Sequence, residues 1–431
     1  MPSPRRFHVE TLGCPKNAVD SDKIEAALAA DGLERADRAA DADLVVVNTC
    51  AFVDAARRES IETVLALAEQ KRAGARLVVT GCMAERYGRE LATELPEVDA
   101  VVGFAGEATI ASHVALKRKP SGVRDLLDLP RPAPRAPWAY LKVAEGCDRA
   151  CAFCAIPSFR GRQRSRAPEA IEAEARQLVE HGVVELVLVA QDLAWYGRDS
   201  GSPRALAPLL RRLDALSDSG LARIRLLYLY PSEVRDPLVA TMLELPTVVP
   251  YFDLSLQHAS GPLLARMKRW GNGDRFVRMI EGIRDREPEA TFRSSFIVGF
   301  PGETEADHEQ LLAFLERACL DWAGFFAYSR EQGTAAARFD GDVDETLVYE
   351  RLRECADVQE PITNAARAAL VGEQVEVLVD GVEDGVTIGR THREAPEIDG
   401  MVRLPGAYAR PGALVHARVV DVEGPDLEAV A

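Results

Sequence analysis

Three cysteines lie close together in the segment Glu145–Pro157, EGCDRACAFCAIP. Their spacing, Cys147-x3-Cys151-x2-Cys154, suits a loop around an iron-sulfur cubane, in which three thiolates hold three irons and the fourth iron stays open. An open iron can bind a substrate, whereas a zinc site would need a fourth protein ligand. No other Cys or His lies within about 25 residues of Cys154, so the segment predicts a 4Fe-4S cluster rather than zinc.

A second set of cysteines is spread widely along the chain. Cys14, Cys50 and Cys82 stand in TLGCPKN, VVNTCAF and VTGCMAE, each at the end of a short apolar run. The carboxyl edge of an open α/β sheet is where such folds build their sites, so we expect the three thiols to meet there. Three buried core thiols remain the alternative. Cys319 and Cys355 have no thiol partner nearby and are expected to be structural.

The elements that must position the second set alternate between strand and helix. Apolar runs at 7–13, 43–48 and 76–81 predict strands, with amphipathic helices between them, which is typical of a parallel α/β sheet. A Pro-rich stretch, Pro130–Pro137, then has the composition of a semi-rigid connector. We place a domain boundary at this connector.

The middle of the chain repeats the β/α pattern, which predicts an open, incomplete barrel of six units. The six apolar runs lie at 140–144, 186–190, 224–229, 252–256, 292–298 and 324–328. From about Gly372 the pattern changes to short alternating strands broken by Gly and Pro, which predicts a small antiparallel β-barrel. The expected fold class is therefore α/β with a C-terminal β-barrel, in domains at 5–121, 133–364 and 367–431.

Length and composition limit the class of protein. The chain has 431 residues, 47% of them hydrophobic and 28% charged, as expected of a folded, multidomain protein. The N-terminal residues contain no apolar segment that would serve as a secretory signal or membrane span, so we expect a cytoplasmic protein with no membrane partner. In a reducing compartment the eight cysteines favour metal or catalytic roles over disulfides.

The triplet, with Phe153 before its last cysteine, resembles the signature of radical S-adenosylmethionine enzymes. The resemblance implies a partial (β/α)6 radical-SAM barrel and a cluster that gives one electron to S-adenosylmethionine, producing a radical that removes hydrogen from carbon. It also implies that Phe153, Gln191 and Gly299 bind this cofactor. For SSFIVGFPGET, which contains Gly299, a plain strand and turn remains the alternative.

The three N-terminal cysteine segments, together with the order of the domains, resemble the methylthiotransferases within that group. The resemblance implies a TRAM-like C-terminal barrel and a second 4Fe-4S cluster, held by Cys14, Cys50 and Cys82, that carries the transferred sulfur. Two S-adenosylmethionine molecules would be used, one to methylate the sulfur and one to make the radical. An electron donor such as flavodoxin or ferredoxin is also expected.

Three motifs bear on the substrate. TLGCPKNAVDS, AQDLAWYG and IPSFRGRQRSR resemble the branch that modifies an aspartate in the decoding-centre protein of the ribosomal small subunit. The branch that modifies adenosine in transfer RNA usually reads GCQMN at the first motif. The expected activity is therefore methylthio transfer to the β-carbon of that aspartate, and transfer-RNA modification remains the alternative.

Charge supports a protein substrate over RNA. Residues 371–431 contain 12 Asp and Glu against 5 Arg and no Lys, a net charge of −7, and the whole chain carries −16. Such a surface should repel phosphates and attract a basic ribosomal protein, so we expect the C-terminal barrel to hold the substrate near the clusters. A merely solubilising acidic face remains the alternative.

One basic run lies beside the triplet: Arg160, Arg162, Arg164 and Arg166. Their alternation predicts that they line one side of an extended segment, where they would bind the acceptor carboxylate or the cofactor. A solvated loop is an equally good interpretation.

Overall fold

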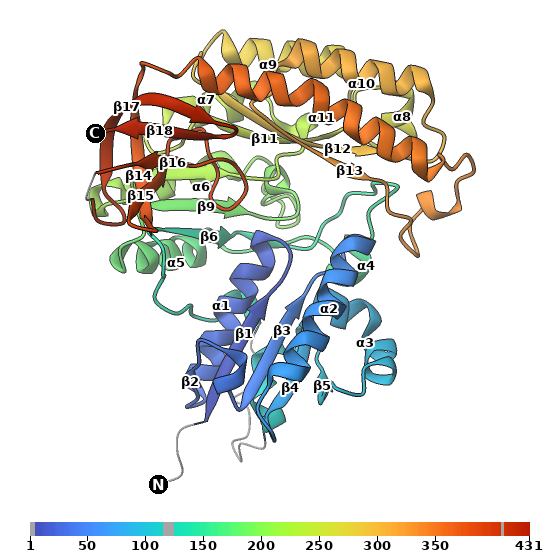
Figure 1. The fold of residues 1–431 in the computed structure, drawn as a ribbon, viewed down its shortest axis with the longest axis vertical. Helices are drawn as coiled ribbons and strands as arrows, with labels where there is room; N and C mark the ends of the chain where they lie inside the picture. The colour runs from blue at the N-terminus through green and yellow to red at the C-terminus, as the bar shows by residue number, and fades with distance from the viewer. Residues whose placement is uncertain (1–4, 115–124, 407–408) are drawn as a thin grey trace.

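The computed structural model describes residues 5–114, 125–406 and 409–431. Its N-terminal part is a five-stranded parallel sheet in the order β2-β1-β3-β4-β5, with helices packed on it (Figure 1). The strands are β1 (Arg6–Thr11), β2 (Glu34–Arg35), β3 (Leu44–Thr49), β4 (Arg76–Gly81) and β5 (Ala100–Val101). The helices are α1 (Pro15–Ala30), α2 (Asp54–Gln70) and α3 (Cys82–Glu94).

The three predicted strands of this sheet are confirmed as β1, β3 and β4. Strand β3 is buried along its whole length, as expected of a central parallel strand covered on both faces. Strands β2 and β5 were not predicted because two residues are too few to show a period. The expected end of the first domain, at residue 121, lies outside the described residues.

The middle of the chain forms the predicted open barrel of six parallel strands. They make two sheets, β6-β9-β10 and β11-β12-β13, linked by the isolated bridges Ile224–Val248 and Leu229–Leu254. The strands are β6 (Trp138–Lys142), β9 (Glu185–Val189), β10 (Arg223–Leu226), β11 (Tyr251–Gln257), β12 (Thr291–Val298) and β13 (Trp322–Ala327). Each lies within three residues of its predicted range at both ends, and β6 and β13 form the two open edges.

Helices cover the outer face of this barrel. They are α5 (Pro168–Glu180), α6 (Leu206–Asp214), α7 (Asp236–Glu244), α8 (Gly261–Arg266), α9 (Gly273–Arg284), α10 (Glu305–Ala318) and α11 (Glu345–Ala368). The short helix α4 (Ile156–Arg160) packs instead on the N-terminal part, where Phe159 joins its apolar core. No described helix has both the length and the apolar character needed to cross a membrane.

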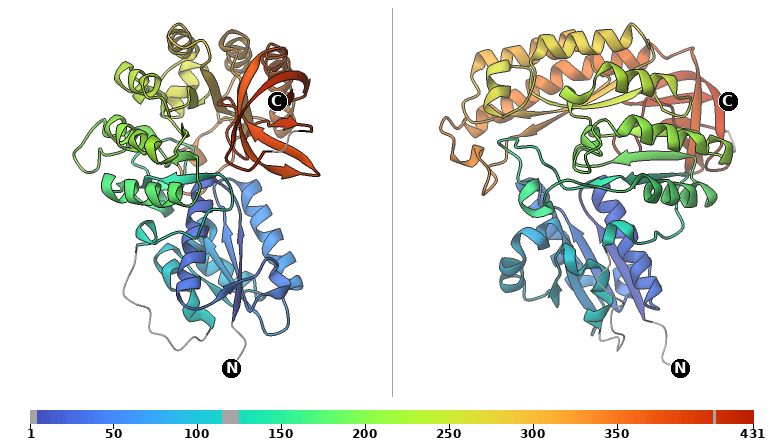
Figure 2. Two further views of the ribbon diagram at one scale, coloured as in Figure 1. Left: turned by 90° about the vertical axis from the view of Figure 1, so that its left-hand side faces the viewer. Right: turned by 180° about the vertical axis from the view of Figure 1, so that it is seen from behind.

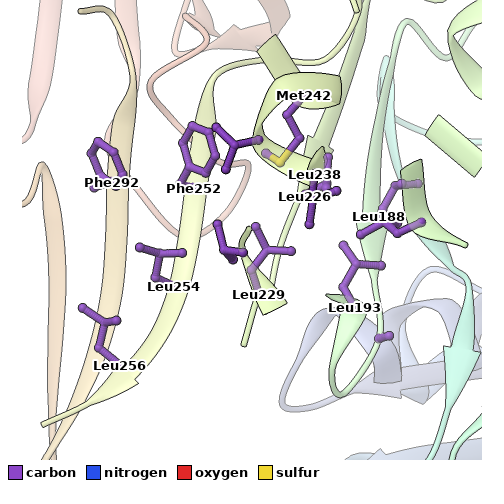
Figure 3. Close-up of a cluster of buried hydrophobic side chains, with 14 of the residues drawn as sticks. Leu188, Leu193, Leu226, Leu229, Leu238, Met242, Phe252, Leu254, Leu256 and Phe292 are labelled. Atoms are coloured by element: carbon purple, nitrogen blue, oxygen red, sulfur yellow. The ribbon is translucent and has the colours of Figure 1, made fainter. Parts of the chain in front are cut away.

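The largest core lies between these helices and the strands (Figure 3). Phe252 of β11 stacks on Phe292 of β12 with their ring centroids 5.4 Å apart, and Met242 of α7 belongs to the same fully buried cluster. Because side chains alternate along a strand, the opposite face of β11 and β12 points into the barrel, where it carries Asp253 and Arg293. The strands therefore separate an apolar outer core from a mixed interior, in which these charged side chains lie beside apolar ones such as Val187 and Tyr251.

The C-terminal part is a closed five-stranded barrel in the order β14-β15-β16-β18-β17, as predicted, except that its β16–β18 pair is parallel rather than antiparallel (Figure 2). Its strands are β14 (Gln374–Glu383), β15 (Val386–Arg390), β16 (Val402–Leu404), β17 (Leu414–Glu423) and β18 (Asp426–Val430). The loop between β15 and β16 reaches the amino ends of the six large-barrel strands. Tyr251 donates a 2.6 Å hydrogen bond to Asp399, and Trp322 donates one of 2.8 Å to the carbonyl of Arg393.

This placement corrects the prediction that the C-terminal barrel holds the substrate near the clusters. The barrel docks at the amino ends of the strands, opposite the loop that carries Cys147. Much of its acidic charge is also used internally, because arginine or tyrosine side chains bind five of the 12 carboxylates. These five are Glu376, Asp380, Glu394, Glu397 and Asp399.

Candidate metal centre

The strand ends of the N-terminal sheet bring Cys14, Cys50 and Cys82 together, as predicted. Cys50 directly follows β3, Cys82 begins α3 directly after β4, and Cys14 is the N-cap of α1. Gly13 turns the chain with a φ of +93°, and a Cβ there would lie 2.9 Å from Sγ of Cys50. Any larger residue would push Cys14 and Cys50 apart, so this glycine keeps the two thiols adjacent.

Asn17 ties the three strand ends together. Its Nδ2 donates to the carbonyls of Leu12 (2.9 Å) and Thr49 (3.1 Å), while its Oδ1 lies 3.7 Å from Sγ of Cys82. The side chain is completely buried. Asn17 stands in the TLGCPKN motif, but no role was predicted for it. Its position about one helical turn after Cys14 could have indicated that its side chain lies near the cysteine.

Arg160 connects this site to the other triplet. Its guanidinium donates to Sγ of Cys82 at 3.2 and 3.3 Å and to Oδ1 of Asn17 at 2.6 Å. The same group binds both carboxylate oxygens of Glu145, at 2.9 and 3.0 Å, and Asp20 at 3.2 Å. Since Glu145 stands two residues before Cys147, this buried network runs from Cys82 to the start of the loop that carries the second triplet.

The predicted arrangement of the basic run is wrong. Arg160 ends helix α4, and Gly161 turns the chain with a φ of +74°, so the four arginines do not line one side of an extended segment. Arg162 is exposed and pairs with Asp148, Arg164 pairs with Asp125, and Arg166 is buried against Glu174. Only Arg160 faces the cysteines.

The second triplet lies in the loop between β7 (Ala144–Glu145) and α4. Gly146 has a φ of +74°, and a Cβ there would lie 2.2 Å from the carbonyl oxygen of Arg162, so only glycine fits. The backbone N–H of Arg149 approaches Sγ of Cys147 at 3.4 Å, and Nη1 of Arg269 approaches Sγ of Cys151 at the same distance. The loop thus offers its thiols inside a shell of N–H donors.

Electrostatics show what the thiols need from a ligand. Burial raises the pKa of Cys147 to about 11 and that of Cys154 and Cys82 to about 12, and neighbouring thiols add to each shift. Burial also acts to raise the pKa of Cys14, but Lys16 and Arg160 together hold it below its ordinary value. Thiolates are required for metal binding, so a bound metal would supply most of the missing positive charge.

The donors fit iron-sulfur clusters better than a single metal ion. Within 5–114, 125–406 and 409–431, no three His, Cys, Asp or Glu side chains converge on one ion position. A cubane spreads its thiolates around several irons, and sulfur-only donor sets are typical of such clusters. All eight cysteines are free thiols, so neither triplet is used in a disulfide.

The three residues expected to bind S-adenosylmethionine have different surroundings. Phe153 is half-buried against the barrel core. Gln191 donates from Nε2 to Glu145 at 2.9 Å, while its buried Oε1 has no partner among the residues described. That free acceptor suits a ligand. These assignments stay predictions.

Gly299 is explained by packing. It has a φ of +80°, a Cβ there would lie 2.4 Å from Val348 of α11, and its N–H donates to Glu303 at 2.7 Å. The close approach of helix α11 therefore requires a glycine here whether or not the residue also contacts a cofactor.

Charged contacts fix the two domains around the cysteines. Arg131 and Arg135 of the Pro-rich connector bind Asp22 and Glu25 of helix α1. On the other side, Glu331, in the loop after β13, accepts hydrogen bonds of 2.6 Å from both Arg57 of α2 and Arg86 of α3. The connector and the Glu331 loop thus contact the N-terminal part on two sides.

Three family models match the chain. "Uncharacterized protein family UPF0004" matches residues 6–103, "Radical SAM superfamily" matches 141–315, and "TRAM domain" matches 371–431. These ranges correspond to the N-terminal sheet, the open barrel and the C-terminal barrel.

Curated relatives match over nearly the whole length. The ribosomal protein uS12 methylthiotransferase RimO of Cutibacterium acnes is 43% identical, with 98% of this chain and 97% of the relative covered. The protein of the same name from a Nocardioides species is 44% identical, with 97% and 95% covered.

Among solved structures, the radical S-adenosylmethionine methyltransferase TsrM from Kitasatospora setae, with cobalamin and a [4Fe-4S] cluster bound, has a TM-score of 0.55. It is 15% identical, and 77% of each chain is covered. At this identity the likeness concerns the fold alone.

Proposed function

Because the chain belongs to the family of ribosomal protein uS12 methylthiotransferases, we propose that it adds a methylthio group to the β-carbon of an aspartate in uS12. It is a radical S-adenosylmethionine enzyme, and its cofactors are 4Fe-4S clusters and S-adenosylmethionine. The chain spans at least 95% of the two relatives described above.

In this proposal Cys147, Cys151 and Cys154 hold the cluster that binds S-adenosylmethionine, and the strand-end cysteines hold an auxiliary cluster. The observation that carries it is the Arg160 guanidinium, which contacts both Cys82 at 3.2 Å and Glu145 at 2.9 Å. Two cofactors held at the ends of one buried network can act on one substrate. The division into 5–121, 133–364 and 367–431 belongs to the same proposal, and the matched ranges support it.

When bound, the clusters supply sulfur and the electron that cleaves S-adenosylmethionine. The protein's own groups position the reactants. Arg160 donates to the sulfur of Cys82, which favours the thiolate form needed for ligation. Gln191 and Phe153 are proposed to orient S-adenosylmethionine, with Oε1 of Gln191 as a hydrogen-bond acceptor. Gly299 would let its strand approach that cofactor closely.

The reaction also needs partners. A one-electron donor such as flavodoxin or ferredoxin is proposed, because reductive cleavage consumes an electron that the described residues do not supply. We place the enzyme in the cytoplasm because uS12, after which its relatives are named, is a ribosomal protein.

The test is a mass measurement on both candidate substrates. Purified enzyme with both clusters, S-adenosylmethionine and a reductant is incubated with uS12 and, separately, with transfer RNA. We expect a methylthio mass increase on one aspartate of uS12 and no change in the RNA. Modified adenosine with unmodified uS12 would replace this function by the transfer-RNA alternative.

A further inference from the structure

Lys16 is a buried cation beside the strand-end cysteines. It lies in the first turn of α1, two residues after Cys14, and only 7% of its surface is exposed. Its Nζ lies 3.5 Å from the centroid of the Tyr228 ring. Across the described part of the chain, no carboxylate forms an ion pair with it.

This position is unfavourable for a lysine in the protein alone. The N-terminus of a helix is the positive end of its dipole, and α1 has no acidic residue in its first turn. Burial of an ammonium without a carboxylate partner adds a desolvation cost. The helix dipole and burial thus both make the Lys16 ammonium unfavourable for stability. We expect such a side chain to be retained because it binds a ligand.

The neighbouring cations show the contrast. Lys142 donates to Asp20 at 2.7 Å and also pairs with Glu145. Arg160 binds the same two carboxylates. Their charges are therefore satisfied by carboxylates within the fold, whereas Lys16 has beside it the Tyr228 side chain and the Cys14 sulfur but, among the described residues, no carboxylate.

Tyr228 holds that face in place. It has a φ of +63°, in the left-handed region, and its N–H donates to Oδ2 of Asp253 at 2.9 Å. Such a conformation costs energy in a residue with a side chain and persists only where the surroundings enforce it. The Tyr228 ring binds the ammonium of Lys16 by a cation–π contact. This contact leaves N–H donors of the ammonium available to an anion.

On the basis of the proposed function, we propose that Lys16 binds the side-chain carboxylate of the acceptor aspartate and selects this residue. The carboxylate is bonded directly to the β-carbon that receives sulfur, so holding it fixes the reacting carbon beside the strand-end cysteines. The carboxylate of S-adenosylmethionine is expected elsewhere, at the open iron of the Cys147 cluster. Lys16 is therefore a specificity-determining residue.

The experiment is a double-mutant cycle on binding. Enzyme carrying both clusters is mixed with uS12, or with uS12 whose acceptor Asp is changed to Asn, in the presence of S-adenosylmethionine and without reductant. Fluorescence anisotropy gives each Kd. Wild-type enzyme should prefer Asp over Asn by roughly tenfold or more, as expected for a charged hydrogen bond. Lys16→Met should bind both proteins with equal affinity.

Two controls separate this role from others. Lys23 lies on the same helix and is buried, but its ammonium already pairs with Glu174 at 3.3 Å, so Lys23→Met should keep the preference for Asp. Iron and sulfide content should be the same in Lys16→Met and in wild-type enzyme. Loss of the auxiliary cluster in Lys16→Met would instead assign the lysine to that cluster and overturn the proposal.

Other results would also overturn it. Equal affinity of the wild-type enzyme for the Asp and Asn forms of uS12 would be one such result. A Lys16→Met variant that still prefers the Asp form would be another. Failure of the proposed function is a separate result, because it appears as absence of methylthiolated uS12 from the wild-type reaction, measured by mass.

Discussion

The guanidinium of Arg160 lies 3.2 Å from Sγ of Cys82, although the two residues are 78 positions apart and belong to different domains. The same guanidinium binds Glu145 and Asp20, and its pKa stays far above the ordinary value because these carboxylates outweigh the cost of burial. The site of the strand-end cysteines therefore includes a residue of the radical-SAM barrel. Docking of the two domains therefore brings Arg160 to Cys82.

Replacing Arg160 tests this dependence. Arg160→Gln leaves Glu145 and Asp20 with Lys142 as their remaining cation, so the free energy of unfolding should fall by at most about 3 kcal/mol in urea titrations. Transfer of the methylthio group should fall further than cleavage of S-adenosylmethionine, as measured by the two products in one assay. Arg162→Gln is the control, because Arg162 is exposed and should leave both products unchanged. An equal loss of both products would argue against a specific role at Cys82.

The two triplets should separate by function. Cys50→Ala is expected to abolish methylthio transfer, while 5′-deoxyadenosine still forms, because Cys147, Cys151 and Cys154 remain intact. Cys151→Ala should abolish both. Each variant should also lose close to half of the iron measured in wild-type enzyme. Methylthio transfer by Cys50→Ala would show that the strand-end cysteines do not carry the sulfur.

Much of this fold could be predicted because its signals are local. The strands of the open barrel are continuous apolar runs, and their predicted ranges agree with the structure to within three residues. The convergence of Cys14, Cys50 and Cys82 followed from a topological rule about the edges of parallel sheets. The strand ranges and the convergence of the cysteines could both be predicted without knowing which side chains meet across domains.

The parts that could not be predicted depend on docking between domains. Arg160 was one of four alternating arginines, and nothing in its neighbourhood showed that a short helix would bury it against Cys82. The net charge of the acidic C-terminal barrel could likewise be counted from the sequence, but its placement was predicted wrongly. The reason is that the arginine partners of Glu394 and Asp399 lie at positions 367 and 293, outside the barrel. Composition records charges but not which of them are neutralised.

The docking of the C-terminal barrel depends on Glu185. This completely buried carboxylate binds Arg225 of β10 at 2.7 Å and Arg390 of β15 at 2.8 Å. Glu185→Gln should lower the free energy of unfolding by about 3 kcal/mol in urea, since Arg225 loses its carboxylate and Arg390 keeps only Asp380. Glu376→Gln is the matched control, because Glu376 is half-exposed at the same interface and its pair with Arg223 should contribute less than about 1 kcal/mol.

His258 should make the stability of the enzyme depend on pH. The side chain is completely buried, its Nδ1 accepts from the N–H of Ser260 at 3.0 Å, and burial lowers its pKa from 6.5 to about 3. Below about pH 6.5 the unfolded chain takes up a proton that the folded protein refuses, so stability falls as the pH falls. The loss from this group should be about 2 kcal/mol between about pH 6.5 and about pH 5. His258→Asn keeps an acceptor for Ser260 but cannot titrate, so urea titrations at the two pH values should show a smaller loss. Equal losses in the variant and the wild type would mean that His258 is not the group responsible.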